Sequence, residues 1–329
     1  MNLDSLVSSP TQQSLEAVSH FRELVFKELR KLIVGQEHAL ELMLCALLSG
    51  GHSLLEGVPG VAKTLMAKTL ASSINARFKR IQFTPDLMPA DILGTSVFDL
   101  KTQTFSLVYG PIFTEILLAD EINRAPAKTQ SALLEAMQER TVSIEGKQIT
   151  LDPIFTVFAT QNPIESEGTY PLPEAQLDRF MFKVEIGYPS AQEEDSILAA
   201  ANSGIYSKGT DTTINVAISP GEILQARAAL TNVHVEPSIL QYIRQLLTAT
   251  RQSPNIRLGA GPRAGVHLLL ASKALAALRG FDFVTPDIVR ALIHPVLQHR
   301  LLLSADAELG GETAERALSQ AVNRIEVPR

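Results

Sequence analysis

The segment from Ser53 to Leu70 carries residues that could bind a phosphate group. It reads S-L-L-E-G-V-P-G-V-A-K-T-L-M-A-K-T-L, and its centre is close to the pattern GxxxxGK[ST]. In a loop of this kind, backbone N–H groups and the start of the next helix point at phosphate oxygens. The ammonium group of Lys63 would neutralise the β- and γ-phosphates, and the hydroxyl of Thr64 would bind Mg²⁺. The expected cradle consists of Gly57, Val58, Pro59, Gly60, Val61, Ala62, Lys63 and Thr64.

One residue departs from this pattern, because Ala62 stands where the pattern has glycine. In a left-handed backbone conformation, alanine would lose about 1–2 kcal/mol. The position directly precedes a predicted helix, so we expect right-handed torsions, for which alanine is favoured over glycine by about 0.8–1 kcal/mol. Gly57 and Gly60 remain where the loop must bend and admit a phosphate. Taken alone, the segment is compatible with a working cradle and with a glycine-bearing structural turn.

Two carboxylates that could complete a phosphate site follow the apolar run Ile116–Ala119. Asp120 is suited to hold Mg²⁺ through water, and Glu121 is placed to polarise an attacking water as a base. The alternative is an acidic turn after a buried strand, which is common in α/β proteins. The phosphate loop earlier in the chain favours the functional interpretation.

A further polar group ends the apolar segment I-F-T-V-F-A-T-Q-N, residues 154–162. Ligands of open parallel sheets bind outside the carboxyl ends of the strands. Asn162 could therefore orient the attacking water or contact the γ-phosphate. The same asparagine could also simply begin a turn before Pro163.

A parallel sheet would bring these residues together, and the pattern along the chain predicts one. Apolar residues at three- and four-residue spacing indicate helices, and short apolar runs indicate strands. Their alternation favours a mainly parallel sheet between helices, an α/β fold. We expect helices at 14–33, 36–49, 62–74 and 127–138, strands at 53–56, 79–83, 113–119 and 154–159, and hairpins at 95–108 and 141–151. In the second hairpin, Val142 and Ile144 should face Ile149 and Leu151 across a turn at Glu145–Gly146.

Helices dominate the chain after Pro189. They are expected at 191–203, 220–230, 236–251, 262–279 and 286–300, with a polar connector over 204–219. The last of them begins with Thr285 as N-cap and Pro286 at the first helical position. We therefore predict two domains: a core over 1–190, with an N-terminal helix and two inserted hairpins, and a helical lid domain over 191–329.

Composition narrows the class of protein. Of 329 residues, 45% are hydrophobic and 19% charged, which is ordinary for a soluble globular protein. No apolar run approaches the roughly 20 residues of a membrane helix, and the first residues lack the order of a signal peptide. Cys45, the single cysteine, is expected to be buried and inert, and a cytoplasmic location is the simplest. The net charge of −6 offers no basic surface for nucleic acid.

Several of these segments together resemble the MoxR family of AAA+ ATPases. They are G-V-P-G-V-A-K-T, L-L-A-D-E-I-N-R-A, A-T-Q-N-P and P-E-A-Q-L-D-R-F. Alanine before the lysine is common in that family, so the resemblance implies that the loop is a phosphate-binding cradle and that Ala62 is compatible with it. The two predicted hairpins lie where this branch of AAA+ proteins carries its helix-2 insertion and its pre-sensor-1 hairpin.

The resemblance implies roles for three more side chains. Asn162 matches sensor 1, and Arg179 matches an arginine finger that reaches the nucleotide of a neighbouring subunit. Arg263 matches sensor 2 at the start of a lid helix. On spacing alone, Arg179 could instead pair with Asp178 at the surface, and Arg263 could face solvent. The segment that flanks adenine in such proteins is matched by Val34, Gly35 and Gln36.

The function implied by this resemblance is ATP hydrolysis with Mg²⁺, used for chaperone-like remodelling of partner proteins. Head-to-tail contacts would close a homo-oligomeric, hexameric ring, and a protein with a von Willebrand factor A domain is the expected partner. Two alternatives remain: an ATP-sensing scaffold that does not need hydrolysis, and a nucleic-acid motor. The acidic balance and the turn I-E-G-K at 144–147 disfavour the motor. No motif names the client protein.

Overall fold

The computed structural model describes residues 10–101, 103–162, 168–205 and 214–328, with side chains from residue 15 onward. It divides into two compact units. One runs from Lys27 to Pro220, and the other combines the described residues up to Phe26 with those from Gly221 onward.

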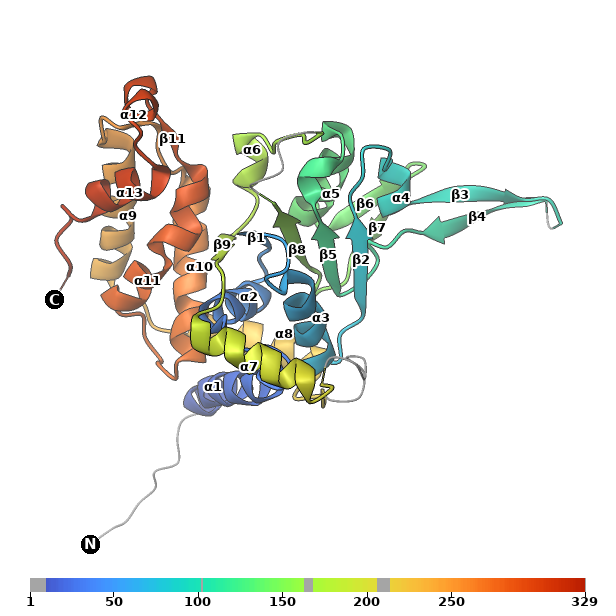
Figure 1. Cartoon of the computed structure of the whole chain (residues 1–329), viewed down its shortest axis with the longest axis horizontal. Helices are drawn as coiled ribbons and strands as arrows, with labels where there is room; N and C mark the ends of the chain where they lie inside the picture. Colours follow the sequence, from blue (N-terminus) through green and yellow to red (C-terminus); the bar gives the residue numbers. More distant parts are fainter. Residues whose placement is uncertain (1–9, 102, 163–167, 206–213, 329) are drawn as a thin grey trace, which may run out of the picture. The chain divides into compact units, whose positions relative to one another are not determined.

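A parallel sheet forms the centre of the first unit (Figure 1). Each neighbouring pair of its strands runs parallel, which confirms the predicted sheet. The side chains of β5 are all buried, as expected for a strand that is covered on both faces. In spatial order, the sheet consists of β2 (Phe78–Gln82), β5 (Ile116–Asp120), β8 (Thr156–Gln161), β1 (Ser53–Gly57) and β9 (Phe182–Ile186). The last of these, β9, was not predicted from the sequence.

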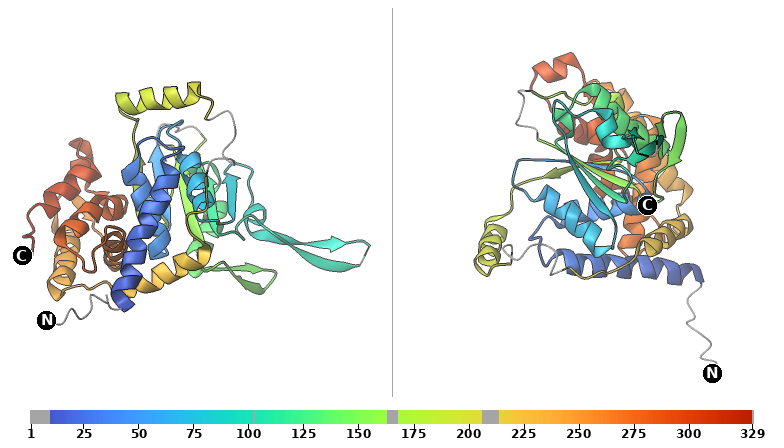
Figure 2. Two further views of the ribbon diagram at one scale, coloured as in Figure 1. Left: turned by 90° about the horizontal axis from the view of Figure 1, so that it is seen from below. Right: turned by 90° about the vertical axis from the view of Figure 1, so that its right-hand side faces the viewer.

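Helices cover both faces of this sheet. Helix α5 (Ala127–Glu139) lies on one face, and α2 (Glu37–Ser49) and α3 (Lys63–Ser73) lie on the other (Figure 2). Leu133 and Leu134 of α5 join the apolar core beneath the strands. Cys45 of α2 is buried, as predicted. The unit also contains the short helices α4 (Pro89–Leu93) and α6 (Glu174–Leu177), the turn η1 (Ile122–Arg124), and α7 (Ala191–Asn202).

Two antiparallel hairpins leave the first unit, as predicted. One is β3 (Gly94–Asp99) with β4 (Thr104–Tyr109), which projects away from the sheet in Figure 1 and in the left view of Figure 2. The other is β6 (Thr141–Ile144) with β7 (Lys147–Thr150). Val142 faces Ile149 as expected, but Ile144 faces Lys147 rather than an apolar residue. The two-residue turn with positive φ at Glu145 and Gly146 fixes this register, and Leu151 already lies beyond β7.

The second unit is helical. Helix α11 begins as predicted, since the Thr285 side chain accepts a hydrogen bond from the Ile288 amide. It ends at Leu297, and residues 298–300 continue as the 3₁₀ turn η4. Helices α12 and α13 were not predicted. The unit contains part of α1 (Pro10–Leu29), α8 (Pro220–Ala229), η3 (Leu230–Asn232), α9 (Pro237–Gln252), α10 (Pro262–Leu278), α11 (Pro286–Leu297), α12 (Ala305–Leu309), α13 (Ala314–Val322), and the paired strands β10 (Ile256–Leu258) and β11 (Leu302–Leu303).

The compact units are divided differently from the predicted ranges 1–190 and 191–329. The chain after residue 190 stays with the core because its backbone is bonded there. The Ala217 amide donates to the carbonyl of Ser73 at the end of α3, at 2.7 Å, and the Asn215 amide donates to Glu28, also at 2.7 Å. Part of the predicted connector over 204–219 lies outside the described residues.

Candidate nucleotide-binding site

The predicted phosphate loop connects β1 to α3, and its lysine lies at the carboxyl edge of the sheet. The Lys63 ammonium donates to the carbonyl oxygens of Gly57, at 2.5 Å, and Gln161, at 3.4 Å. Burial lowers the pKa of Lys63, while the negative charges of Asp120, Glu121 and Glu56 oppose that shift. The lysine is therefore within electrostatic reach of Asp120, the predicted Mg²⁺ ligand, and of Glu121, the predicted base.

The expected right-handed conformation of Ala62 is wrong. Its φ is 63° and its ψ is 20°, in the left-handed region. Ala62 is the N-cap residue of α3 and lies outside the helix, so the helix does not impose right-handed torsions on it. Gly60 has a φ of 88°, so the loop bends through two left-handed positions before Lys63. The loop keeps this shape although alanine costs about 1–2 kcal/mol in it.

The two predicted acids lie at the end of β5 and are joined through one hydroxyl. Asp120 is 8% exposed, and its Oδ1 accepts a hydrogen bond from the Thr160 hydroxyl at 2.5 Å. The same Thr160 oxygen accepts from the backbone amide of Glu121 at 2.8 Å. Thr160 therefore fixes Asp120 and Glu121 against β8.

Three polar side chains that the sequence analysis missed hold the carboxylates. Asp120 Oδ2 accepts from Arg80 Nη2 at 2.6 Å and from Arg80 Nε at 3.0 Å. Glu121 Oε2 accepts from Gln82 at 2.7 Å and from Arg124 at 3.0 Å. Arg80 and Gln82 alternate on β2 and so share one face of that strand. This alternation was visible in the sequence, but the pairing of β2 with β5 was not.

The donor atoms at this edge suit Mg²⁺. Thr64 supplies a hydroxyl on the first turn of α3, and Asp120 supplies a carboxylate. Mg²⁺ prefers oxygen ligands and is usually bound by one or two carboxylates together with substrate phosphates. Within the part of the chain that the structure describes, no group of three or more His, Cys, Asp or Glu could hold a metal. A site of this kind depends on the nucleotide for its remaining ligands.

Asn162 follows β8 directly and is buried, with 6% of its surface exposed. Because β1, β5 and β8 run parallel as neighbours, Gly57, Asp120 and Asn162 lie at the same edge of the sheet. The sequence-predicted placement of these three residues is therefore confirmed. Their chemical roles stay predictions.

The arginines and the predicted adenine segment lie in other places. Arg179 lies between α6 and β9 and is half-buried. Arg263 is exposed at the start of α10 in the other unit. Val34 and Gly35 lie between α1 and α2. Gly35 has a φ of 68°, and a Cβ there would overlap the carboxylate of Glu193.

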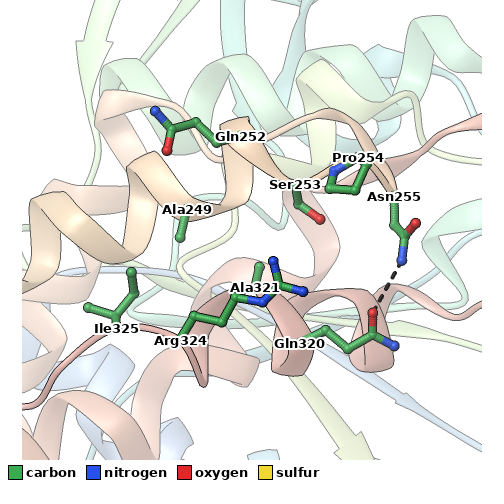
Figure 3. A pocket seen from close by; sticks show the side chains of 9 residues that line it. All are labelled: Ala249, Gln252, Ser253, Pro254, Asn255, Gln320, Ala321, Arg324 and Ile325. Carbon is green, nitrogen blue, oxygen red and sulfur yellow. Dashed lines mark hydrogen bonds between the residues drawn. The ribbon is translucent and has the colours of Figure 1, made fainter.

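A cavity in the helical unit contains none of the predicted site residues. It lies between the end of α9 and α13, with the Arg324 side chain beside Ala321 (Figure 3). Asn255 and Gln320 are hydrogen-bonded across it at 3.2 Å. The lining residues are Ala249, Gln252, Ser253, Pro254, Asn255, Gln320, Ala321, Arg324 and Ile325.

Comparison with known proteins places this geometry in a family. Residues 52–182 match the model described as "ATPase family associated with various cellular activities (AAA)", and residues 248–321 match the "AAA lid domain". The chain is 43% identical over 327 residues to Chaperone MoxR1 of Mycobacterium tuberculosis, covering 96% of this chain and 85% of that one. It is 30% identical over 318 residues to Protein MoxR of Paracoccus denitrificans, covering 89% and 92%.

A solved structure shows the same architecture. A crystal structure from Cytophaga hutchinsonii matches with a TM-score of 0.87 at 37% identity, over 95% of this chain and 98% of that one. The matched ATPase region contains the phosphate loop, Asp120, Glu121 and Asn162, and the matched lid lies in the helical unit. With this identity over nearly its whole length, the chain belongs to the MoxR family of AAA ATPases.

Proposed function

We propose that this protein hydrolyses ATP with Mg²⁺ and uses the reaction to remodel partner proteins in the manner of a chaperone. The observation that supports hydrolysis most directly is the convergence of Lys63, Asp120 and Glu121 at one edge of the parallel sheet, where both carboxylates affect the pKa of the lysine. The name of the relative from Mycobacterium tuberculosis, Chaperone MoxR1, supports the remodelling role.

Each residue of this edge has a task in the proposal. Lys63 and the backbone N–H groups of residues 57–64, other than the proline at 59, bind the β- and γ-phosphates. Thr64 and Asp120 hold Mg²⁺, which would neutralise phosphate charge when bound. Glu121 takes a proton from the attacking water, and Asn162 orients that water. Val34 and Gly35 flank the adenine.

We propose further that the active form is a homo-oligomeric ring, with six subunits as the resemblance implies. Arg179 would complete the site of the neighbouring subunit, and Arg263 would act from the lid. The partial exposure of Arg179 between α6 and β9 supports a role in trans. An arginine supplied in this way contributes about 10³–10⁵ in rate in well-studied cases.

The same proposal includes a partner protein, a substrate class and a cellular location. We expect a protein with a von Willebrand factor A domain as its partner, and the net charge of −6 disfavours nucleic acid as its substrate. A cytoplasmic location fits a chain with a single cysteine. The structure adds one finding here: in its described part, no helix is long and apolar enough to cross a membrane.

Replacement of the proposed base tests hydrolysis separately from binding. Glu121→Gln keeps the shape of the side chain but removes its basicity, so we expect ATP to bind with an unchanged dissociation constant and turnover to fall at least about 100-fold. Calorimetry measures binding, and phosphate release measures turnover. Glu135→Gln, at an exposed position of α5, is the matched control and should leave both values unchanged.

Hydrolysis by Glu121→Gln at the wild-type rate would exclude Glu121 as the base. Once a client protein is identified, the same variant distinguishes the remodelling function from that of an ATP-sensing scaffold. A scaffold would keep its effect on the client when ATP binds without being hydrolysed.

A further inference from the structure

An ion pair lies directly beneath the phosphate loop. Glu56 immediately precedes Gly57 at the end of β1, and Lys183 lies on the neighbouring strand β9. The Lys183 ammonium is 2.5 Å from Glu56 Oε2, and both side chains are 20% exposed. A second carboxylate, Glu185, lies 3.8 Å from the same ammonium and is 55% exposed. Lys183 is therefore bound mainly to the more buried acid.

Glu56 places a negative charge within electrostatic reach of Lys63, the lysine proposed to bind the phosphates. Its carboxylate is close enough to Lys63 to raise the pKa of that lysine against the effect of burial. The same Lys63 ammonium is bonded to the carbonyl oxygen of Gly57, the residue after Glu56. Charges separated by a few ångströms in a partly buried site interact strongly. An uncompensated Glu56 would therefore repel the phosphates that the loop attracts.

Strand β9 also supports the loop sterically. A Cβ on Gly57 would overlap the carbonyl oxygen of Ile186, the last residue of β9. Because β1 and β9 pair in register from Ser53 to Gly57, the base of the loop lies directly against this strand. The position of Lys183 relative to Glu56 is thus fixed by a rigid element rather than by a loop.

We infer that Lys183 is a positioning residue of the nucleotide site. It neutralises Glu56 and holds that carboxylate toward β9, so that the phosphates of ATP meet the loop without an uncompensated charge on Glu56. Lys183 acts through Glu56 and has no contact with the nucleotide in this account. The inference rests on the proposed function, because it assigns Lys183 a part in binding the proposed substrate.

An ordinary cross-strand ion pair would behave differently. Partly exposed pairs contribute about 0–1 kcal/mol to stability, and losing one would change the unfolding midpoint without a specific effect on nucleotide affinity. The distinguishing readout is therefore the dissociation constant for nucleotide, together with its dependence on Glu56.

The experiment measures binding of ATPγS in excess Mg²⁺ to the full chain by calorimetry. Lys183→Met should weaken binding at least about tenfold, because it leaves Glu56 uncompensated beside the loop. It should raise the KM for ATP by a similar factor and leave kcat at saturating ATP within about twofold. Lys183→Arg keeps the positive charge and should bind normally.

A double variant shows whether the effect passes through Glu56. Glu56→Gln combined with Lys183→Met removes both charges, and its affinity should return to within about threefold of wild type. The matched control is Lys79→Met, which removes one positive charge from an exposed position of β2 on the face opposite Arg80. This control should bind ATPγS like wild type.

Normal binding by Lys183→Met would overturn the inference, and so would a loss of affinity that the double variant does not recover. If Lys183→Met does not fold, Glu56→Gln alone carries the test. It leaves Lys183 without its main acid and should tighten binding at least about threefold, so unchanged or weaker binding would contradict the inference. Failure of the wild-type protein to bind ATPγS would contradict the proposed function itself.

Discussion

Ala62 has a strained, left-handed backbone conformation in the proposed phosphate loop. A left-handed conformation costs an L-residue about 1–2 kcal/mol, and such strain persists where the surrounding structure determines it. Here β1 precedes the loop and α3 follows it, and both elements are fixed. The loop between them must direct its backbone N–H groups at the proposed phosphate position. The left-handed backbone of Ala62 is strained in that geometry, whereas a glycine would adopt the same backbone without strain.

The residue-scale prediction follows directly. Ala62→Gly should raise the free energy of unfolding by about 0.5–1 kcal/mol, since the removed strain exceeds the entropy cost of the added glycine. The measurement is the urea midpoint of the full chain. Ala67→Gly, at a buried position inside α3, is the matched control and should destabilise by about 1 kcal/mol or more. Destabilisation by Ala62→Gly would contradict the account of the loop.

The site was predictable from the sequence only where a motif names the residue. Lys63, Asp120 and Asn162 each lie next to a strand end or a helix start, so local pattern was enough to place them. Arg80 and Gln82 escaped prediction because their hydrogen bonds reach Asp120 and Glu121 on a different strand. Strand order is a property of the whole sheet, and no local pattern in β2 contains it.

At the scale of elements, the same limit explains β9. Its sequence F-K-V-E-I alternates apolar and charged residues over only five positions, which does not separate a short edge strand from a loop. Its register with β1 is a long-range pairing. The start of α11, in contrast, was predictable because its N-cap and proline act within one turn. Local interactions determine where α11 begins, whereas the formation of β9 depends on its pairing with β1.

The element-scale prediction concerns that helix start. Thr285→Ala removes the acceptor of the Ile288 amide and should destabilise the helical unit by about 1 kcal/mol. Scanning calorimetry of the full chain should show a lower midpoint for the transition of that unit, by a few degrees (about 2–8 °C). Thr285→Ser retains a hydroxyl and should melt close to wild type. An unchanged midpoint in Thr285→Ala would show that the cap does not stabilise α11.

For the whole molecule, the proposed chemistry would need more than one chain. Lys63, Asp120, Glu121 and Asn162 come from one sheet edge of one subunit, whereas Arg179 would serve the site of a neighbour. A head-to-tail contact of this kind closes into a ring when its rotation permits. Arg179 and Glu121 of a single active site would then belong to different subunits.

Mg²⁺-dependent ATP hydrolysis per subunit, measured over a wide range of protein concentration, tests whether neighbouring subunits complete one active site. We expect turnover to rise with concentration as subunits assemble, and Arg179→Ala to lower turnover by about 10³-fold or more. Mixing Arg179→Ala with Glu121→Gln should restore part of the activity, because some interfaces then combine an intact Glu121 with an intact Arg179. A turnover independent of concentration, or mixtures as inactive as the separate variants, would contradict the account.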